Sequence, residues 1–285
     1  MPNIGFLGPQ GSFSEEGLQE WLQKQNNLFD EPVTLRPYPS IPRLLWACDR
    51  SELDFAFVPL ENSIDGQVGA TLDTLNQTEN LLIFREYIHP IHQCLLTLRP
   101  LPLHEINKVF SHEQALGQCR EFLESKLPQA QQIICTSTAE AAATLSAHDD
   151  YSAAIGPRQA AKLYGLHCLE DHIQDTTANA TRFILVGHHL ADLSDCDKTS
   201  LLFSTDNSPG SLSAVLQELS QRELNLTRIE SRPSKQKLGE YIFFIDVDGY
   251  VFMPELQEAL WALRQMEVRL KLLGSYPKYP YDMVF

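Results

Sequence analysis

The sequence lacks a long hydrophobic run and an excess of positive charge. None of its apolar segments approaches the roughly 20 residues that a membrane-spanning helix needs, and no basic stretch followed by an apolar run opens it. Lys and Arg number 22 against 37 Asp and Glu, so the formal net charge is −15. A field of that sign repels phosphate backbones. We therefore expect a cytoplasmic protein with no nucleic-acid or membrane partner.

Signatures of cofactor and metal chemistry are also missing. No GxGxxG follows a predicted strand, there is no P-loop, and no two of the six cysteines have CxxC spacing. Because the cysteines are scattered and most have apolar neighbours, we expect reduced thiols in the core. We expect no cofactor and no metal. Since the acidic field also repels anionic substrates, a site for an anion must be built locally from arginines and helix N-termini.

Strands and helices alternate along the first two thirds of the chain. Short apolar runs end in turn-forming residues and lead into amphipathic segments, as at 3–22 and 108–123. This alternation predicts an α/β fold with mostly parallel sheets, in which ligands bind beyond the carboxyl ends of strands. Polar clusters that follow strands are therefore expected around one cleft. These clusters are 8–14, 59–66, 111–114 and 136–140.

A polar break at 188–198 precedes a part of the chain with a different pattern. From 199 to 273 the order is strand, helix, strand, strand, helix, strand, which is the βαββαβ order of a ferredoxin-like sandwich. We take 198–276 as a separate domain. The remaining residues, 277–285, are expected to form an extended tail.

The segment from 179 to 183 combines several useful side chains. Thr181 offers a hydroxyl, Arg182 a planar fork for a carboxylate and Phe183 an apolar ring. On composition alone an ordinary strand edge with one exposed arginine is the simpler interpretation. The polar stretch 59–63 has the same ambiguity, because turns after strands are commonly polar.

Four motifs, in order along the chain, resemble those of prephenate dehydratases. Gly8–Glu15 (GPQGSFSE) resembles the opening signature of that family, with Ser12 where threonine is commoner. The stretch 59–63 (PLENS) matches P-[IL]-E-N-S, and 181–183 matches T-R-F. The stretch 111–119 (SHEQALGQC) resembles S-H-P-Q-A-L-x-Q-C with a glutamate in the place of proline.

The second part of the chain resembles the ACT domain that is attached to these enzymes. The resemblance is carried by Asp206–Leu212 and by 230–233 (ESRP). It implies a two-lobed catalytic domain over 1–190 with a periplasmic-binding-protein-like cleft, followed by a ferredoxin-like ACT domain over 198–276. The lobes are expected to comprise 1–78 with 168–190, and 79–167.

The resemblance also implies a reaction in phenylalanine biosynthesis. Prephenate loses carbon dioxide and its ring hydroxyl, giving phenylpyruvate. Because ring aromatisation drives this reaction, the enzyme mainly has to help the hydroxyl leave and to orient two carboxylates. Thr181 is implied at the leaving hydroxyl as a donor or relay, and Arg182 as a carboxylate clamp, unless an extended strand turns it away. The other implied site residues orient the substrate or exclude water: Ser12, Phe13, Glu61, Asn62, Ser63, Ser111, Gln114 and Phe183.

The ACT resemblance implies feedback by L-phenylalanine, an allosteric inhibitor. The turn at 207–212 has free N–H groups that suit a carboxylate, although an ordinary capped helix is the simpler interpretation of the pattern alone. Such domains pair across subunits, so a homodimer or homotetramer is implied. The implied phenylalanine-binding residues are Asn207, Pro209, Gly210, Ser211, Leu212, Asn225, Leu226, Thr227, Glu230 and Ser231.

Two alternatives stay open at this point. Arogenate carries an amine where prephenate has a keto group, and no residue in the sequence decides between the two substrates. A two-lobed cleft joined to an ACT domain also fits a non-catalytic amino-acid sensor.

Overall fold

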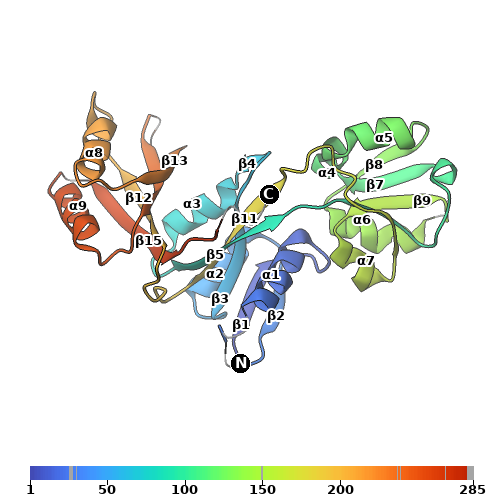
Figure 1. The fold of residues 1–285 in the computed structure, drawn as a ribbon, viewed down its shortest axis with the longest axis horizontal. Coiled ribbons are helices and arrows are strands. Elements are labelled where there is room, and N and C mark those ends of the chain that lie inside the picture. Colours follow the sequence, from blue (N-terminus) through green and yellow to red (C-terminus); the bar gives the residue numbers. More distant parts are fainter. Residues whose placement is uncertain are drawn as a thin grey trace.

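The computed structural model describes residues 1–25, 28–29, 31–148, 150–235, 237, 239–266 and 268–280. Three α/β units lie in a row, with the first lobe between the second lobe and the C-terminal domain (Figure 1). The two-lobed α/β architecture followed by a βαββαβ domain is confirmed. Within the described residues, no helix has both the length and the apolar character that a membrane span needs.

The first lobe is built on a mixed sheet with the strand order β5-β11-β3-β1-β2. Its strands are β1 (Asn3–Leu7), β2 (Thr34–Tyr38), β3 (Phe55–Asn62), β4 (Gly66–Gln67), β5 (Leu82–Pro90) and β11 (Ala180–Gly187). Its helices are α1 (Phe13–Lys24), α2 (Ile41–Asp49) and α3 (Gly69–Gln77). Ser12 caps α1 by accepting from the Glu15 N–H at 3.4 Å, as the capping-box spacing predicts.

Strand β3 runs farther than the sequence indicates. Its apolar run ends at Val58, and Pro59 suggests a break, yet the strand continues through Asn62. The proline lies where the register with β11 shifts, so the ladder loses no regular bond there. This extension places Asn62 directly opposite Thr181.

The second lobe has a sheet of its own, with the order β10-β6-β9-β7-β8. Its strands are β6 (Cys94–Thr97), β7 (Lys108–His112), β8 (Gln131–Cys135), β9 (Ser152–Gly156) and β10 (His167–Glu170). Its helices are α4 (Glu113–Gln118), α5 (Arg120–Lys126), α6 (Thr138–Thr144) and α7 (Arg158–Tyr164), with short 3-10 turns at Leu103–Glu105 and Leu145–Ala147. The pattern over 108–123 indicates one strand followed by one helix, but the helix is divided at Cys119, whose backbone leaves the helical region.

The expected lobe boundaries at 78/79 and 167/168 need correction. Strand β5 pairs with β11 and therefore belongs to the first lobe, whereas β10 pairs with β6 and belongs to the second. The chain thus crosses between β5 and β6, and returns between β10 and β11. Thr181 pairs with His89 and His167 with Thr97, and pairing between strands so distant in sequence depends on tertiary packing, which hydrophobic periodicity does not reveal.

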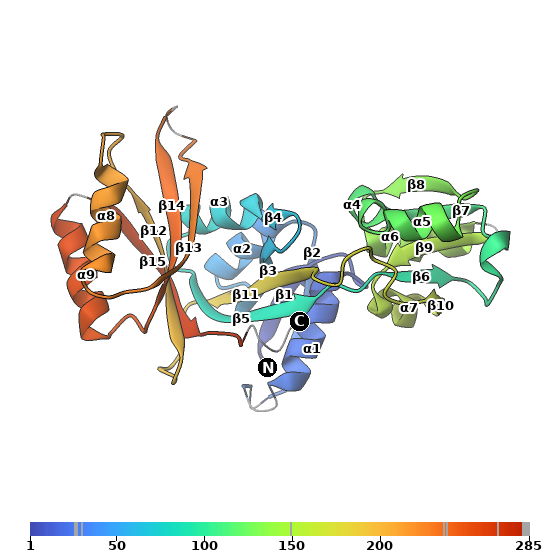
Figure 2. The ribbon, with the colours of Figure 1, turned by 45° about the horizontal axis from the view of Figure 1, so that its top comes forward.

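The C-terminal domain has the antiparallel order β13-β14-β12-β15. Its elements are β12 (Asp197–Ser204), α8 (Ser211–Ser220), β13 (Leu226–Pro233), β14 (Tyr241–Asp248), α9 (Pro254–Gln265) and β15 (Arg269–Pro277). Helices α8 and α9 cover the outer face of its sheet (Figure 2). The tail expected over 277–285 is described only to residue 280, so Tyr281 and the residues after it lie outside the described part.

The inner face of this sheet packs on the first lobe. Leu202, Phe244 and Tyr276 share a core with α2 and α3, while Leu201 and Phe203 face the helices of their own domain. Strand β15 also touches β5 in parallel, so the two sheets continue into one another. The C-terminal domain therefore packs directly against the first lobe through the inner face of its sheet.

Candidate active site

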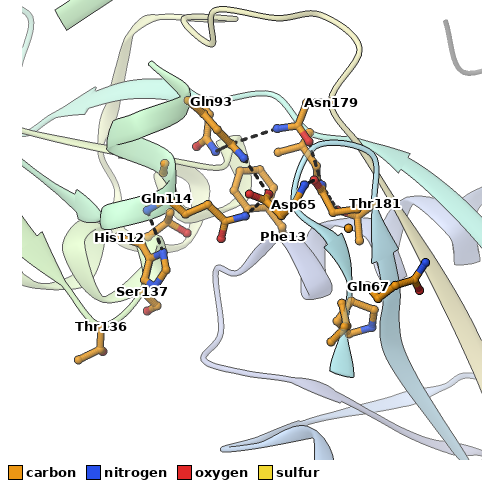
Figure 3. Close-up of a pocket in the computed structure, with 18 residues that line it drawn as sticks. Phe13, Asp65, Gln67, Gln93, His112, Gln114, Thr136, Ser137, Asn179 and Thr181 are labelled. Atoms are coloured by element: carbon orange, nitrogen blue, oxygen red, sulfur yellow. Dashed lines mark hydrogen bonds between the residues drawn. The ribbon is translucent and has the colours of Figure 1, made fainter. Parts of the chain in front are cut away.

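A cavity of about 510 Å³ lies between the two lobes (Figure 3). It collects residues from all four polar clusters that the sequence places after strands. Its lining residues are Phe13, Pro59, Asn62, Asp65, Gly66, Gln67, Val68, Ile91, Gln93, His112, Gln114, Ala115, Gln118, Thr136, Ser137, Thr138, Asn179 and Thr181.

Thr181 and Asn62 form the centre of the first-lobe wall. The Asn62 Nδ2 group donates to Thr181 Oγ1 at 2.9 Å and lies within hydrogen-bond range of Asn179 Oδ1 and the Ala180 carbonyl. The orientation of the Asn62 amide is set by its oxygen, which accepts from the backbone N–H groups of residues 64 and 65 at 2.9 and 3.0 Å. Because Thr181 accepts from Asn62, its own proton is available for donation towards the cavity.

A chain of side-chain amides crosses the cleft beside this pair. Asn179 Nδ2 donates to Gln118 Oε1 at 3.0 Å, and Gln93 Nε2 approaches the same oxygen at 3.3 Å. Gln118 and Gln114 both donate to Asp65, which thereby links the lobes. The sequence motifs contain Gln114 and Gln118, and Asn179 and Asp65 lie in the segments 179–183 and 59–66 that the sequence places near the cleft, without a role for either side chain. Gln93 lies outside every motif, and only the tertiary arrangement brings it into the site.

The second-lobe wall is made from the starts of two helices. His112 caps α4, its Nδ1 accepting from the Gln114 N–H at 3.3 Å, which leaves Nε2 as the donor of the neutral ring. Ser137 caps α6 by accepting from the Glu140 N–H at 3.0 Å. The lining residues include no arginine and no lysine. The cavity therefore offers neutral donors and helix starts to a ligand.

Four of the expected site residues support the cavity without lining it. Ser63 Oγ accepts from the Ala180 N–H at 2.9 Å and so fixes the start of β11. Ser111 Oγ is buried and donates to the Ile155 carbonyl, and Ser12 caps α1. Phe183 stacks on Phe57 at 4.7 Å within the first-lobe core, so it does not shield a substrate ring directly, whereas Phe13 lines the cavity.

Arg182 and Glu61 point away from the cavity, which corrects the expected clamp. Successive side chains of a strand face opposite sides, so Arg182 lies on the side opposite to Thr181. Its Nε atom is 2.7 Å from Glu86 Oε2, and its side chain is 4% exposed. Glu61 pairs with Arg182 at 3.2 Å.

The ionised form of Glu61 is held by charge. Burial raises the pKa of this carboxyl, but Arg182 and Arg228 outweigh that effect, so its pKa lies below the ordinary value. The side chain of Arg228, from the C-terminal domain, lies 3.1 Å from Glu61. Glu61 is therefore a structural anchor between domains in this arrangement.

The turn before α8 forms a smaller cavity of about 280 Å³. It is lined by Asn207, Gly210, Ser211 and Leu212 among others, and Gly210 adopts φ +89° there. Pro209 belongs to the same turn without lining the cavity.

The residues of 225–231 that are expected at the same pocket lie elsewhere within one chain. Asn225 bonds Asp248, and Thr227 donates to the backbone of Asp246. Strand β13 is an edge strand separated from β12 by β14, so Leu226, Glu230 and Ser231 do not reach the turn before α8. A pocket that joins both groups would need a second copy of the domain.

A possible metal-ligating group lies outside the cavity. Among the described residues, the ligand atoms of Cys94, Cys168 and Asp171 all lie within 4.8 Å of one another. Cys94 already donates to Asp171 at 3.1 Å, and Arg158 pairs with the same carboxylate. Burial raises the pKa of the Cys94 thiol, which disfavours the thiolate that a metal requires.

Comparison with known proteins places this geometry in a family. A family model described as prephenate dehydratase matches residues 4–191, and one described as ACT domain matches 199–259. The bifunctional chorismate mutase/prephenate dehydratase of Neisseria gonorrhoeae is 38% identical over 275 residues, covering 96% of this chain and 74% of that protein. The prephenate dehydratase of Amycolatopsis methanolica is 37% identical over 281 residues, covering 98% and 89%.

Two solved structures share this fold. Prephenate dehydratase from Arthrobacter aurescens, solved in complex with L-Phe, has a TM-score of 0.87 and 35% identity, covering 97% of this chain and 90% of that one. A structure described as a novel type of quorum quenching acylase has a TM-score of 0.85 and 26% identity, covering 98% and 99%. The family model spans most of the chain, and the relatives match nearly all of it. The chain therefore belongs to the prephenate dehydratase family and carries an ACT domain after its catalytic region.

Proposed function

We propose that this protein converts prephenate to phenylpyruvate, carbon dioxide and water. The observation that supports this most directly is the Asn62–Thr181 pair, which presents a polarised hydroxyl at the wall of a cavity lined by neutral donors. In the reaction the bond to the ring carboxylate breaks and its electron pair completes the aromatic ring, while the electron pair of the ring C–O bond leaves with the departing oxygen. The departing hydroxyl takes up one proton to form water.

Thr181 assists this departure as a hydrogen-bond donor. A threonine hydroxyl is too weak an acid to give up its proton outright, so its role is to stabilise charge that develops on the leaving oxygen. The Asn62 amide strengthens this donation, because hydrogen bonds in a chain polarise one another. Where Thr181 relays a proton to the leaving oxygen, its hydroxyl receives another from solvent in the same step.

The two substrate carboxylates require donors other than an arginine. We assign this binding to Gln114, Gln118 and the start of α6, which face the cavity. Asp65 accepts from both glutamines in the described structure. Since a carboxylate repels a dianion, substrate binding is expected to displace Asp65 from the glutamine amides.

The substrate is tested by direct assay. Pure protein is incubated with prephenate or with arogenate, and formation of phenylpyruvate or phenylalanine is followed at equal enzyme concentration. Faster turnover of prephenate supports the proposal. Faster turnover of arogenate would assign the amine-bearing substrate, and no turnover of either would leave the protein a non-catalytic sensor.

We further propose that L-phenylalanine inhibits this reaction through the ACT domain. The support is the cavity at the turn before α8 and the relative from Arthrobacter aurescens, which was solved with L-Phe bound. Since the β13 residues lie apart from this cavity in one chain, we propose a homodimer or homotetramer in which two ACT domains complete each site.

The acidic charge and free cysteines fit a cytoplasmic location.

A further inference from the structure

A group of charges, four of them buried and two partly buried, packs against the face of β11 that points away from the cavity. We call it the interdomain charge cluster. It comprises Glu61, Glu86 and Arg182 from the first lobe, and Lys198, Arg228 and Asp246 from the ACT domain. Each domain supplies three members, and the six hold three positive and three negative charges within the described part of the chain. Neither domain could bury its own members alone without leaving charge uncompensated.

Arg182 is the centre of this cluster. Its Nη1 atom lies 2.7 Å from Asp246 Oδ2, and its Nη2 atom donates to the Tyr276 hydroxyl at 3.0 Å. Asp246 is itself 2% exposed and accepts from Ser200 at 2.6 Å. The guanidinium is therefore fixed from the ACT side by a carboxylate and a phenol, both of which are buried and held by further bonds.

The charges in the cluster are stabilised mutually. Burial raises the pKa of Asp246, but the charges of Arg182, Arg228 and Lys198 outweigh this, so its pKa lies below the ordinary value. Lys198 lies 2.9 Å from Glu86 and is 2% exposed. Buried ion pairs of this kind are sensitive to substitution, because removal of one partner leaves the other buried and unpaired.

The cluster touches the catalytic pair through the backbone. Arg182 follows Thr181 in β11, and Glu61 precedes Asn62 in β3. The two strands pair with Thr181 opposite Asn62 and Arg182 opposite Glu61. Thr181 and Asn62 share the 2.9 Å hydrogen bond at the cavity. Their neighbours Arg182 and Glu61 form ion pairs with the ACT domain on the opposite face of the sheet.

We propose that Asp246 and Arg228 of the ACT domain are positioning residues for catalysis, acting on Thr181 through Arg182 and on Asn62 through Glu61. This inference rests on the proposed dehydratase function. It assigns the ACT domain a part in the basal reaction, because the catalytic strand pair is held in register from behind by side chains that the catalytic domain does not contain.

The same contacts offer a route from the proposed regulatory site. Arg228 lies on β13 opposite Asp246, and Thr227 donates to the Asp246 carbonyl at 3.2 Å. Residues implied in phenylalanine binding therefore adjoin both positioning residues. A shift of β13 on ligand binding would move the groups that hold Arg182 and Glu61.

The substitution Asp246→Asn tests the proposal. It keeps the shape of the side chain while removing the charge that faces Arg182. We expect kcat for prephenate to fall between about tenfold and a hundredfold, the scale seen for ångström misplacement of catalytic groups, with KM changed less than about threefold. The matched control is Glu258→Gln, on the exposed face of α9, which should keep wild-type kcat.

All variants are assayed well below their melting temperatures, as judged by circular dichroism. A kcat for Asp246→Asn equal to that of Glu258→Gln would overturn the proposal and leave the cluster a purely structural contact. Should Asp246→Asn fail to fold, Tyr276→Phe decides, since it removes only the hydroxyl bonded to Arg182. A lowered kcat there supports the proposal, and an unchanged kcat rejects it. Absence of turnover in wild-type protein would instead refute the proposed function.

Discussion

His89 is a buried histidine on the strand beside Thr181. It lies on β5 opposite Thr181 and packs on the Phe183 ring. Its ring nitrogens lie 3.5 Å from Glu16 and 3.3 Å from Glu20. Burial lowers the pKa of His89, but the two carboxylates outweigh it and leave the pKa above its ordinary value. The same contact with His89 lowers the pKa of Glu20 to about 2.

The contact of His89 with Glu16 and Glu20 predicts a pH dependence of folding stability. A histidine whose folded pKa is raised contributes stability that is fully present below its unfolded value of 6.5 and is lost as the pH rises through the folded value. We expect the free energy of unfolding in urea to fall from pH 6 towards pH 9 by more in wild-type protein than in His89→Gln. Exposed His104 gives the control: His104→Gln should follow the wild-type curve. An equal fall of the free energy of unfolding with pH in wild type and in His89→Gln would contradict the raised pKa of His89.

Motifs identified part of the site at the residue scale, and geometry supplied the remainder. Thr181, Asn62, Gln114 and Phe13 line the cavity as their motifs imply. Arg182 belongs to an equally clear motif yet serves the other side of its strand. Its partner Asp246 lies 64 residues away along the chain, so no local pattern could reveal the pairing.

At the scale of elements, the junction of β15 with β5 depends on a glycine. Gly274 has φ +152°, and a Cβ built on it would lie 2.3 Å from the Ile83 carbonyl oxygen. Gly274 is also the residue at which β15 pairs with β5. The absence of a side chain is therefore what lets the ACT sheet join the sheet of the first lobe.

Replacement of this glycine should weaken the protein. We expect Gly274→Ala to lower the free energy of unfolding by roughly 2 kcal/mol or more, because the backbones must separate and the conformation is strained. Gly117→Ala is the control, since Gly117 is an exposed position of α4 with nothing within 4 Å of the added Cβ, and alanine favours helix by about 0.5–1 kcal/mol. Chemical denaturation measures both. A neutral Gly274→Ala would show that the strands tolerate separation.

The elements were predictable where local chemistry decides them. Capping residues and apolar periodicity suffice to locate α1 and α2, since each helix is capped by a serine that precedes an apolar stripe. The apolar run does not locate the end of β3, because Pro59 is accommodated by a register shift that only pairing with β11 creates. The assignment of β5 and β10 to lobes likewise depended on partners distant in sequence.

At the scale of the molecule, the sequence predicts the order of the domains but not the contacts between them. The motifs indicate a cleft and then an ACT domain. No motif shows that the ACT sheet packs against α2 and α3 or that Arg232 of the ESRP motif bonds Asp73 on α3 at 3.0 Å. Such contacts depend on complementary surfaces that both domains form only after folding.

The proposed regulation is a property of the whole assembly. We expect millimolar L-phenylalanine to inhibit turnover and to favour the larger oligomer, since a site completed by two copies links binding to association. Activity and light scattering are measured across the same titration, with L-alanine as the control amino acid. Unchanged activity together with unchanged oligomer size would contradict feedback through the ACT domain.

The hydroxyl of Thr181 is the centre of the catalytic proposal, and Thr181→Val tests it most directly. Valine keeps the shape, and Asn62 Nδ2 retains the Asn179 and Ala180 acceptors, so folding should be preserved. We predict that kcat for prephenate falls by a factor of about 10²–10³ in Thr181→Val, while Thr181→Ser, which keeps the hydroxyl, retains much more activity. A Thr181→Val enzyme with wild-type kcat would contradict the account.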